Sequence, residues 1–169
     1  EDGSVVTWGD SYSGGDSSRV SHKLSSGVKR IFSTRSSYTA LKDDGSIVIW
    51  GGGLNVYGNG DGVPDELSGV TDIFTTEKAF AALKNDGSVV TWGDSNNGGD
   101  SSTVAEQLSS DVVDIFSTRT DEFSRASDGY AFAALKNDGS VITWGGERGG
   151  DSSEVAEQLR SEVIEIVSN

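Results

Sequence analysis

The stretch Ala79–Gly93, Ala-Phe-Ala-Ala-Leu-Lys-Asn-Asp-Gly-Ser-Val-Val-Thr-Trp-Gly, recurs along the chain. Related copies stand at Tyr38–Gly51 and Ala131–Gly145, and the second half alone opens the chain at Asp2–Gly9. The four tryptophans mark the period, with two steps of 42 residues and a third of 52. Because a period of about 20–50 residues is typical of solenoids, propellers and arrays, the repeat decides the fold.

Each full copy predicts a β-hairpin. Ala79–Lys84 alternates as one strand, Asn85-Asp86-Gly87 supplies a turn in which Gly takes positive φ, and Ser88–Trp92 returns as the second strand. Its Val-Val-Thr-Trp segment is rich in β-branched and aromatic residues, which suit a pleated sheet. We expect one large aromatic per repeat to fill the space between packed sheets. These residues are Trp8, Trp50, Trp92 and Trp144.

A polar loop ending in Gly-Gly-Asp-Ser-Ser follows the Trp-Gly segment in every repeat except the second. In the third repeat, Val104–Leu108 then predicts a helix of one and a half turns that presents Val104 and Leu108 to a core. Asp111–Thr118 predicts a third strand, through Val113 and Ile115. Matching segments stand at 28–34, 70–76 and 163–169.

The pattern therefore predicts an all-β fold, a β-propeller-like array of four repeats of about 42 residues, each with three strands and a short helix. The array is one unit over 1–169, with repeats near 1–36, 37–78, 79–128 and 129–169. The Ala-Leu-Lys strand occurs three times and the other two strands four times, so one strand is missing before Asp2. This count indicates an open fragment of a longer propeller rather than a closed ring.

Charge and composition exclude several functional classes. The chain has 27 Asp and Glu residues against 13 Lys and Arg, a net charge of −14 that disfavours nucleic acid and anionic lipid as partners. The absence of Cys excludes a disulfide framework, a thiolate metal site and a cysteine nucleophile. No apolar run reaches the roughly 18–20 residues that a membrane-spanning helix needs. The compartment stays undecided.

The second repeat replaces the Gly-Gly-Asp-Ser-Ser loop with residues 58–67. There, Asn59, Asp61 and Asp65 have the spacing of positions 3, 5 and 9 of an EF-hand-type calcium loop. Positions 1 and 12 would be Tyr57 and Ser68, which supply no carboxylate. Calcium is one interpretation of this loop, and a plain Gly/Pro turn is the other.

The ten extra residues between the third and fourth tryptophans lie within 119–130. Insertions in repeat proteins map to loops on one face, often a binding face, so Phe123 and Arg125 are candidate partner contacts. The alternative is that the extra residues form a surface loop that tolerates added length and binds nothing.

The sequence offers no catalytic constellation. The single histidine, His22, is predicted to lie on the exposed side of the first short helix, at a position where other repeats carry Glu. The recurring Asp16, Asp100 and Asp151 predict helix caps, with a ring of carboxylates that binds a cation as the alternative. No cofactor is expected.

The motif Ala-Leu-Lys-x-Asp-Gly-Ser-Val-x-x-Trp-Gly, followed by a Gly-Gly loop, a Val-x-x-x-Leu segment and a Val-x-x-Ile strand, resembles the RCC1-type repeat over nearly the whole chain. The resemblance implies a β-propeller in which a strand from the neighbouring repeat completes each blade. The chain departs from the family in its shorter repeats, its Gly-Gly-Asp-Ser-Ser loop and its four repeats instead of seven.

These features predict a non-enzymatic module for protein–protein interaction or scaffolding, including a peripheral subunit of a multi-subunit complex. One alternative is a secreted or cell-surface structural or adhesin segment that uses calcium. The other, implied by the resemblance alone, is guanine-nucleotide exchange, which we do not expect.

Overall fold

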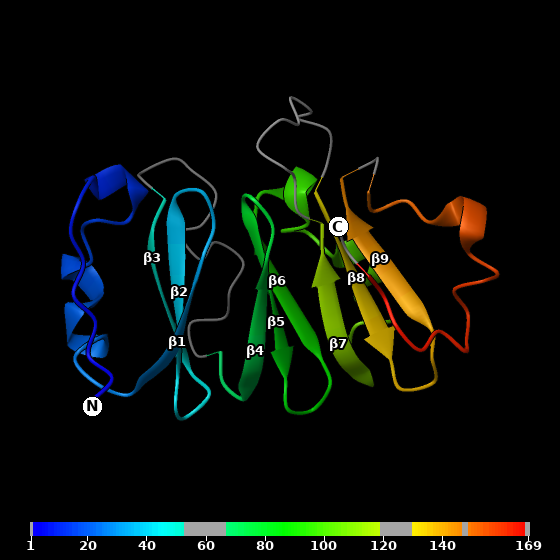
Figure 1. Cartoon of the computed structure of the whole chain (residues 1–169), viewed down its shortest axis with the longest axis horizontal. Helices are drawn as coiled ribbons and strands as arrows, with labels where there is room; N and C mark the ends of the chain where they lie inside the picture. Colours follow the sequence, from blue (N-terminus) through cyan, green and yellow to red (C-terminus); the bar gives the residue numbers. More distant parts are fainter. Residues whose placement is uncertain (1, 53–66, 119–129, 147–148, 168–169) are drawn as a thin grey trace.

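The structure, a computed structural model, describes residues 2–52, 67–118, 130–146 and 149–167. In this part of the chain, nine strands form three antiparallel sheets of three strands each, which stand side by side in a row (Figure 1). The strands are β1 (Val28–Ser33), β2 (Ser37–Lys42), β3 (Ile47–Gly51), β4 (Val70–Thr75), β5 (Ala79–Lys84), β6 (Val89–Gly93), β7 (Val112–Ser117), β8 (Ala131–Lys136) and β9 (Val141–Gly145). The expected all-β repeat array is confirmed, as an array of three sheets.

Each sheet is built around an Ala-Leu-Lys-type strand. β2, β5 and β8 are the central strands, and each is flanked by the Val-x-x-Ile strand before it and the Trp-Gly strand after it. The hairpin over 79–93 has the expected register, with Phe80 opposite Trp92 and Leu83 opposite Val89. Because β4 precedes the repeat that supplies β5 and β6, each sheet joins strands from two successive sequence repeats.

The hydrophobic core lies between successive sheets. Leu41 from the first sheet packs in one cluster with Ile73 and Trp92 from the second. A second cluster joins Ala81 of β5 to residues of the third sheet, such as Phe132. Burial of these apolar side chains is the main source of stability in such a fold. The prediction of core tryptophans is confirmed for Trp50, Trp92 and Trp144, which are 7%, 1% and 3% exposed.

The prediction fails for the first tryptophan and for the last strand. Trp8 is 83% exposed, and neither Val5–Gly9 nor the described part of 163–169 forms a strand. A strand requires a hydrogen-bonded neighbour, and in the described sheets each Val-x-x-Ile strand and each Trp-Gly strand has an Ala-Leu-Lys strand as that neighbour. Among the described residues, neither end segment has one.

The short helix predicted over Val104–Leu108 forms with another type and other bounds. The chain forms a short 3-10 helix, η4 (Ser102–Val104), followed by turns, and Leu108 still reaches the core at 1% exposure. So short a segment cannot offset the cost of helix nucleation, whereas a tight turn delivers the leucine equally well. The other 3-10 helices are η1 (Ser11–Ser13), η2 (Ser18–Lys23), η3 (Ser95–Asn97) and η5 (Ser153–Val155). No helix in the described ranges is long and apolar enough to span a membrane.

Candidate interaction surface at the end of the array

The first residues, Asp2–Gly9, are held where a Trp-Gly strand would lie, at one end of the row of sheets (Figure 1, blue). The Val5 amide donates to the Leu24 carbonyl at 2.9 Å, and the Val28 amide donates to the Gly3 carbonyl at 3.0 Å. Backbone hydrogen bonds thus fix this segment on its inner side.

A side-chain contact adds to this attachment. The hydroxyls of Thr7 and Ser17 lie 2.8 Å apart. The same three contacts recur around β6 and β7, as Val89–Leu108, Val112–Gly87 and Thr91–Ser101. The end segment therefore keeps the attachment of a strand without being part of a sheet.

The opposite side of the end segment carries exposed apolar side chains. Val6 and Trp8 are 78% and 83% exposed, whereas Val5 and Thr7 are partly buried. Val6 and Trp8 are two residues apart, so their side chains lie on the same side of this extended segment. In the described residues, the exposed side chains of Val6 and Trp8 are the clearest candidate site for contact with a partner.

A cavity of about 510 Å³ lies between the first two 3-10 helices and β3. Its lining includes Tyr12, Arg19 and Trp50. Tyr12 is itself an exposed aromatic at 67%. The cavity lining includes neither Val6 nor Trp8, so the cavity is separate from these two exposed side chains.

The other end of the array has a comparable edge. The Val163 amide donates to the Gly139 carbonyl at 3.0 Å, as Val112 does to Gly87. Ile164 and Val167 are 93% and 83% exposed. This segment also holds the place of a strand that lacks a neighbour among the described residues.

The recurring aspartates stabilise turns. Oδ1 of Asp16, Asp100 and Asp151 each accepts the backbone N–H two residues further on, at 2.9 Å. This bond is the first cause of the lowered pKa of each carboxyl group. The prediction that these aspartates are the N-caps is wrong, because Ser17, Ser101 and Ser152 occupy the N-cap positions and each Asp stands one residue earlier. Within the described residues no group of three or more potential ligands is arranged to hold a metal ion.

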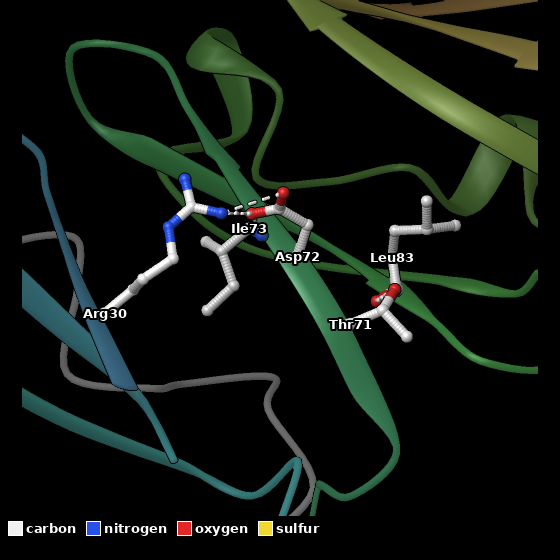
Figure 2. Close-up of polar contacts among 5 residues, drawn as sticks. All are labelled: Arg30, Thr71, Asp72, Ile73 and Leu83. Atoms are coloured by element: carbon white, nitrogen blue, oxygen red, sulfur yellow. Dashed lines mark hydrogen bonds and ion pairs between the residues drawn. The ribbon is translucent and has the colours of Figure 1, made fainter. Parts of the chain in front are cut away.

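Polar contacts between sheets lie along the strands that begin each sheet. Arg30 of β1 donates to both carboxylate oxygens of Asp72 of β4, at 2.9 and 3.0 Å (Figure 2). Arg35 donates to Glu77 at 3.0 Å. The pKa of Glu77 is lowered, first by a hydrogen bond to Tyr130 and then by Arg35. These surface ion pairs join the first two sheets and contribute little stability each.

Several candidate residues from the sequence analysis are not part of the surface formed by Val6 and Trp8. His22 is exposed on η2, as expected. The calcium candidates Asn59, Asp61 and Asp65 lie outside the described residues. The partner-contact candidates Phe123 and Arg125 also lie outside them.

Sequence reasoning missed the apolar edge itself. Trp8 was assigned to the core because its local sequence equals that of Trp92. The signal that could have found it was the strand count, since a Trp-Gly strand without a preceding Ala-Leu-Lys strand has no partner for its aromatic side chain.

Comparisons with known proteins place the chain in no family. No protein-family model matches it, and no curated protein matches it. Among solved structures it is similar to the CRINKLY WD40 ectodomain of the Arabidopsis thaliana receptor kinase ACR4, with 18% identity and a TM-score of 0.45 over 86% of this chain and 45% of that one. It is also similar to human WBSCR16, with 17% identity and a TM-score of 0.44 over 81% of this chain and 36% of that one. The chain spans less than half the length of either structure.

Proposed function

We propose that this chain is a non-enzymatic module for protein–protein interaction, built of RCC1-like repeats, that contacts its partner through the exposed apolar side chains of Val6 and Trp8. The observation that carries the proposal is the exposure of Val6 and Trp8 on a segment that backbone hydrogen bonds already hold in place. Preorganised apolar surface favours binding because less conformational entropy is lost on association.

The electrostatics of the chain agree with a binding role. The aspartates of the turns, such as Asp86 and Asp138, have lowered pKa values caused mainly by hydrogen bonds from the following serines. These ionised carboxylates add to the acidic surface of the chain. The net charge of −14 then favours a partner with basic groups.

Cross-linking mass spectrometry on the native extract tests the proposal, with a lysine-reactive reagent. Lys23 and Lys29 adjoin the residues that hold the end segment, so they should cross-link to one constant partner. The double variant Val6→Ser/Trp8→Ser should lose that partner. The matched control Val113→Ser, which replaces a half-exposed residue of β7 at 50% exposure, should keep it.

A partner that stays cross-linked in the double variant would show that the end of the array is not the docking surface. Loss of the partner in both variants would indicate general destabilisation, so thermal unfolding of each variant accompanies the measurement.

A further inference from the structure

We propose that Asp72 and Asp114 block strand addition at the free edges of β4 and β7, each by binding the backbone N–H that follows it on the open side of its strand. The chain that they keep from pairing there is a second copy of this protein. This inference is independent of the proposed interaction function, because it concerns strands within the row of sheets and not Val6 and Trp8.

Both strands lie at an edge of their sheet. The strand orders are β4-β5-β6 and β7-β8-β9, so among the described residues β4 and β7 each pair with one strand only. The other side of an edge strand presents unpaired backbone N–H and C=O groups, on which another extended chain can pair. An array of such sheets therefore repeats the same potential pairing site from sheet to sheet.

Both edges are irregular at the same place. The register with the central strand shifts between Val70 and Asp72 in β4, and between Val112 and Asp114 in β7. A bulge of this kind disrupts the ladder locally and increases the twist of the strand. Native proteins use bulges on edge strands to make them poor templates for pairing.

The residue after each bulge adds a hydrogen bond. Asp72 Oδ1 accepts the Ile73 N–H at 2.8 Å (Figure 2). In the third sheet, Asp114 Oδ1 accepts the Ile115 N–H, also at 2.8 Å. The side chains of Ile73 and Ile115 are 3% and 2% exposed, and this burial fixes the backbone that carries the two N–H groups.

The position of these N–H groups follows from the geometry of the ladder. Successive N–H groups of a paired strand face opposite sides, and those on the inner side donate to the central strand. An N–H whose acceptor is a side chain of its own strand is therefore the one on the open side. A second strand could use it only by breaking a charge-assisted hydrogen bond, which is stronger than one between neutral groups.

The first sheet has a basic residue at the same position. β1 shows the same shift of register between Val28 and Arg30. The Arg30 guanidinium lies 4.7 Å from the centre of the Phe32 ring and donates to the Asp72 carboxylate (Figure 2). Charged side chains on an edge strand also discourage pairing. Asp72 thus has two partners, whereas Asp114 has no basic partner among the described residues.

Asp114 gives the cleaner test for that reason. Asp114→Ala removes the acceptor of the Ile115 N–H, whereas Asp114→Asn keeps an oxygen acceptor and removes the charge. In dilute protein, hydrogen exchange followed by NMR should show the Ile115 amide exchanging about tenfold faster in Asp114→Ala than in the wild type. In Asp114→Asn the rate should stay close to that of the wild type.

Self-association is the second measurement. Sedimentation velocity at rising protein concentration should show a dimer of Asp114→Ala that wild type and Asp114→Asn do not form. Hydrogen exchange should place the new protection of this dimer at residues 112–117. The matched control is Asp138→Ala, which removes the same charge and the same kind of bond to a backbone N–H from a turn, and it should leave association unchanged.

Three results would overturn the inference. One is an Ile115 amide that exchanges equally fast in wild type and Asp114→Ala, because the N–H would then not depend on the carboxylate. Another is faster exchange in Asp114→Ala without protection of residues 112–117 at high concentration, because the edge would then be closed by other means. The third is equal association of Asp114→Asn and Asp114→Ala, because charge rather than the hydrogen bond would then block pairing.

The second sheet provides an independent repeat. Asp72→Ala removes the acceptor of the Ile73 N–H, and Arg30→Ala removes only the ion pair to the same carboxylate. Exchange of the Ile73 amide should be faster in Asp72→Ala and nearly unchanged in Arg30→Ala. Equal acceleration in both variants would show that the ion pair, and not the bond to the N–H, protects this edge.

Discussion

The chain contains the same nine residues twice, at 2–10 and 86–94, in two different surroundings. In the second copy Trp92 is 1% exposed and stacks on Phe80. In the first copy Trp8 is 83% exposed. Both copies keep the turn glycine in the left-handed region, at φ of 68° for Gly3 and 76° for Gly87. The nine residues therefore set the local conformation of the turn, and the neighbouring strand determines whether the tryptophan is buried.

The largest expected difference between the two copies concerns the tryptophans. Trp92→Ala should lower the free energy of unfolding by about 3–5 kcal/mol, because it leaves a cavity between the first two sheets. Trp8→Ala should change it by less than about 0.5 kcal/mol, because the side chain is exposed. Urea denaturation of both variants measures the contrast. Equal losses would mean that Trp8 is buried in solution, and the comparison would fail.

The sequence predicted what depends on local pairing. The hairpin of 79–93 could be predicted because its two strands and its turn are contiguous, and the turn residues set the register. Leu108 could be predicted as a core residue, although the helix around it is a 3-10 turn. Strand formation at 5–9 and 163–167 could not be judged from the local pattern, because it depends on a neighbour that the pattern does not contain. The exposure of Trp8 was missed for the same reason.

The glycines after the two tryptophans sharpen the comparison. Gly9 and Gly93 have nearly the same φ, 110° and 112°. A Cβ on Gly9 would meet nothing within 4 Å, whereas a Cβ on Gly93 would lie 2.5 Å from the Lys78 carbonyl oxygen and 2.7 Å from Ala79 Cα. The space beside the glycine is therefore empty at Gly9 and filled by the adjacent strand at Gly93.

Alanine at either glycine costs about 1–3 kcal/mol in backbone strain. Gly93→Ala should cost about 1–3 kcal/mol more than Gly9→Ala, because backbone atoms cannot move away as a flexible side chain can. Thermal or urea unfolding of the pair gives this difference directly. Equal destabilisation would show that the two sites have the same surroundings.

The turn before each Val-x-x-Ile segment allows the reverse substitution, from another residue to glycine, because its residue differs between repeats. The residue before each Val-x-x-Ile segment has a φ of 66–72°, and it is Gly27, Gly69, Asp111 or Glu162. Glu162→Gly should raise the free energy of unfolding by about 0.5–1 kcal/mol, because glycine adopts this conformation without a Cβ penalty. Asp111→Gly should gain less, since Asp tolerates the left-handed region better.

Gly27→Ala is the matched control for that turn. Its Cβ would have no neighbour closer than 3.6 Å, so only backbone strain acts, and a loss of about 0.5–1 kcal/mol is expected. A gain from Gly27→Ala, or a loss from Glu162→Gly, would contradict the assignment of the strain to φ.

The smallest expected difference concerns the first aspartate of each copy. The Ser88 hydroxyl and N–H, with Lys84, lower the pKa of Asp86 to about 2, and the Ser4 N–H and hydroxyl lower the pKa of Asp2. Because Lys84 belongs to the neighbouring strand and none of the described residues places a lysine beside Asp2, NMR titration should show a smaller downward shift of the pKa for Asp2 than for Asp86. Coincident midpoints would show that the strand neighbour contributes nothing to the shift.

The same shift fixes the sign of the pH dependence. A folded-state pKa below the unfolded value means that ionised Asp86 favours the folded state. Its contribution is complete above about pH 4 and is lost as the pH falls towards 2. The stability difference between wild type and Asp86→Ala should therefore be constant near neutral pH and shrink below pH 4. The difference for Asp2→Ala should be smaller at every pH, because an end segment without a partner strand can fray while the three sheets stay folded.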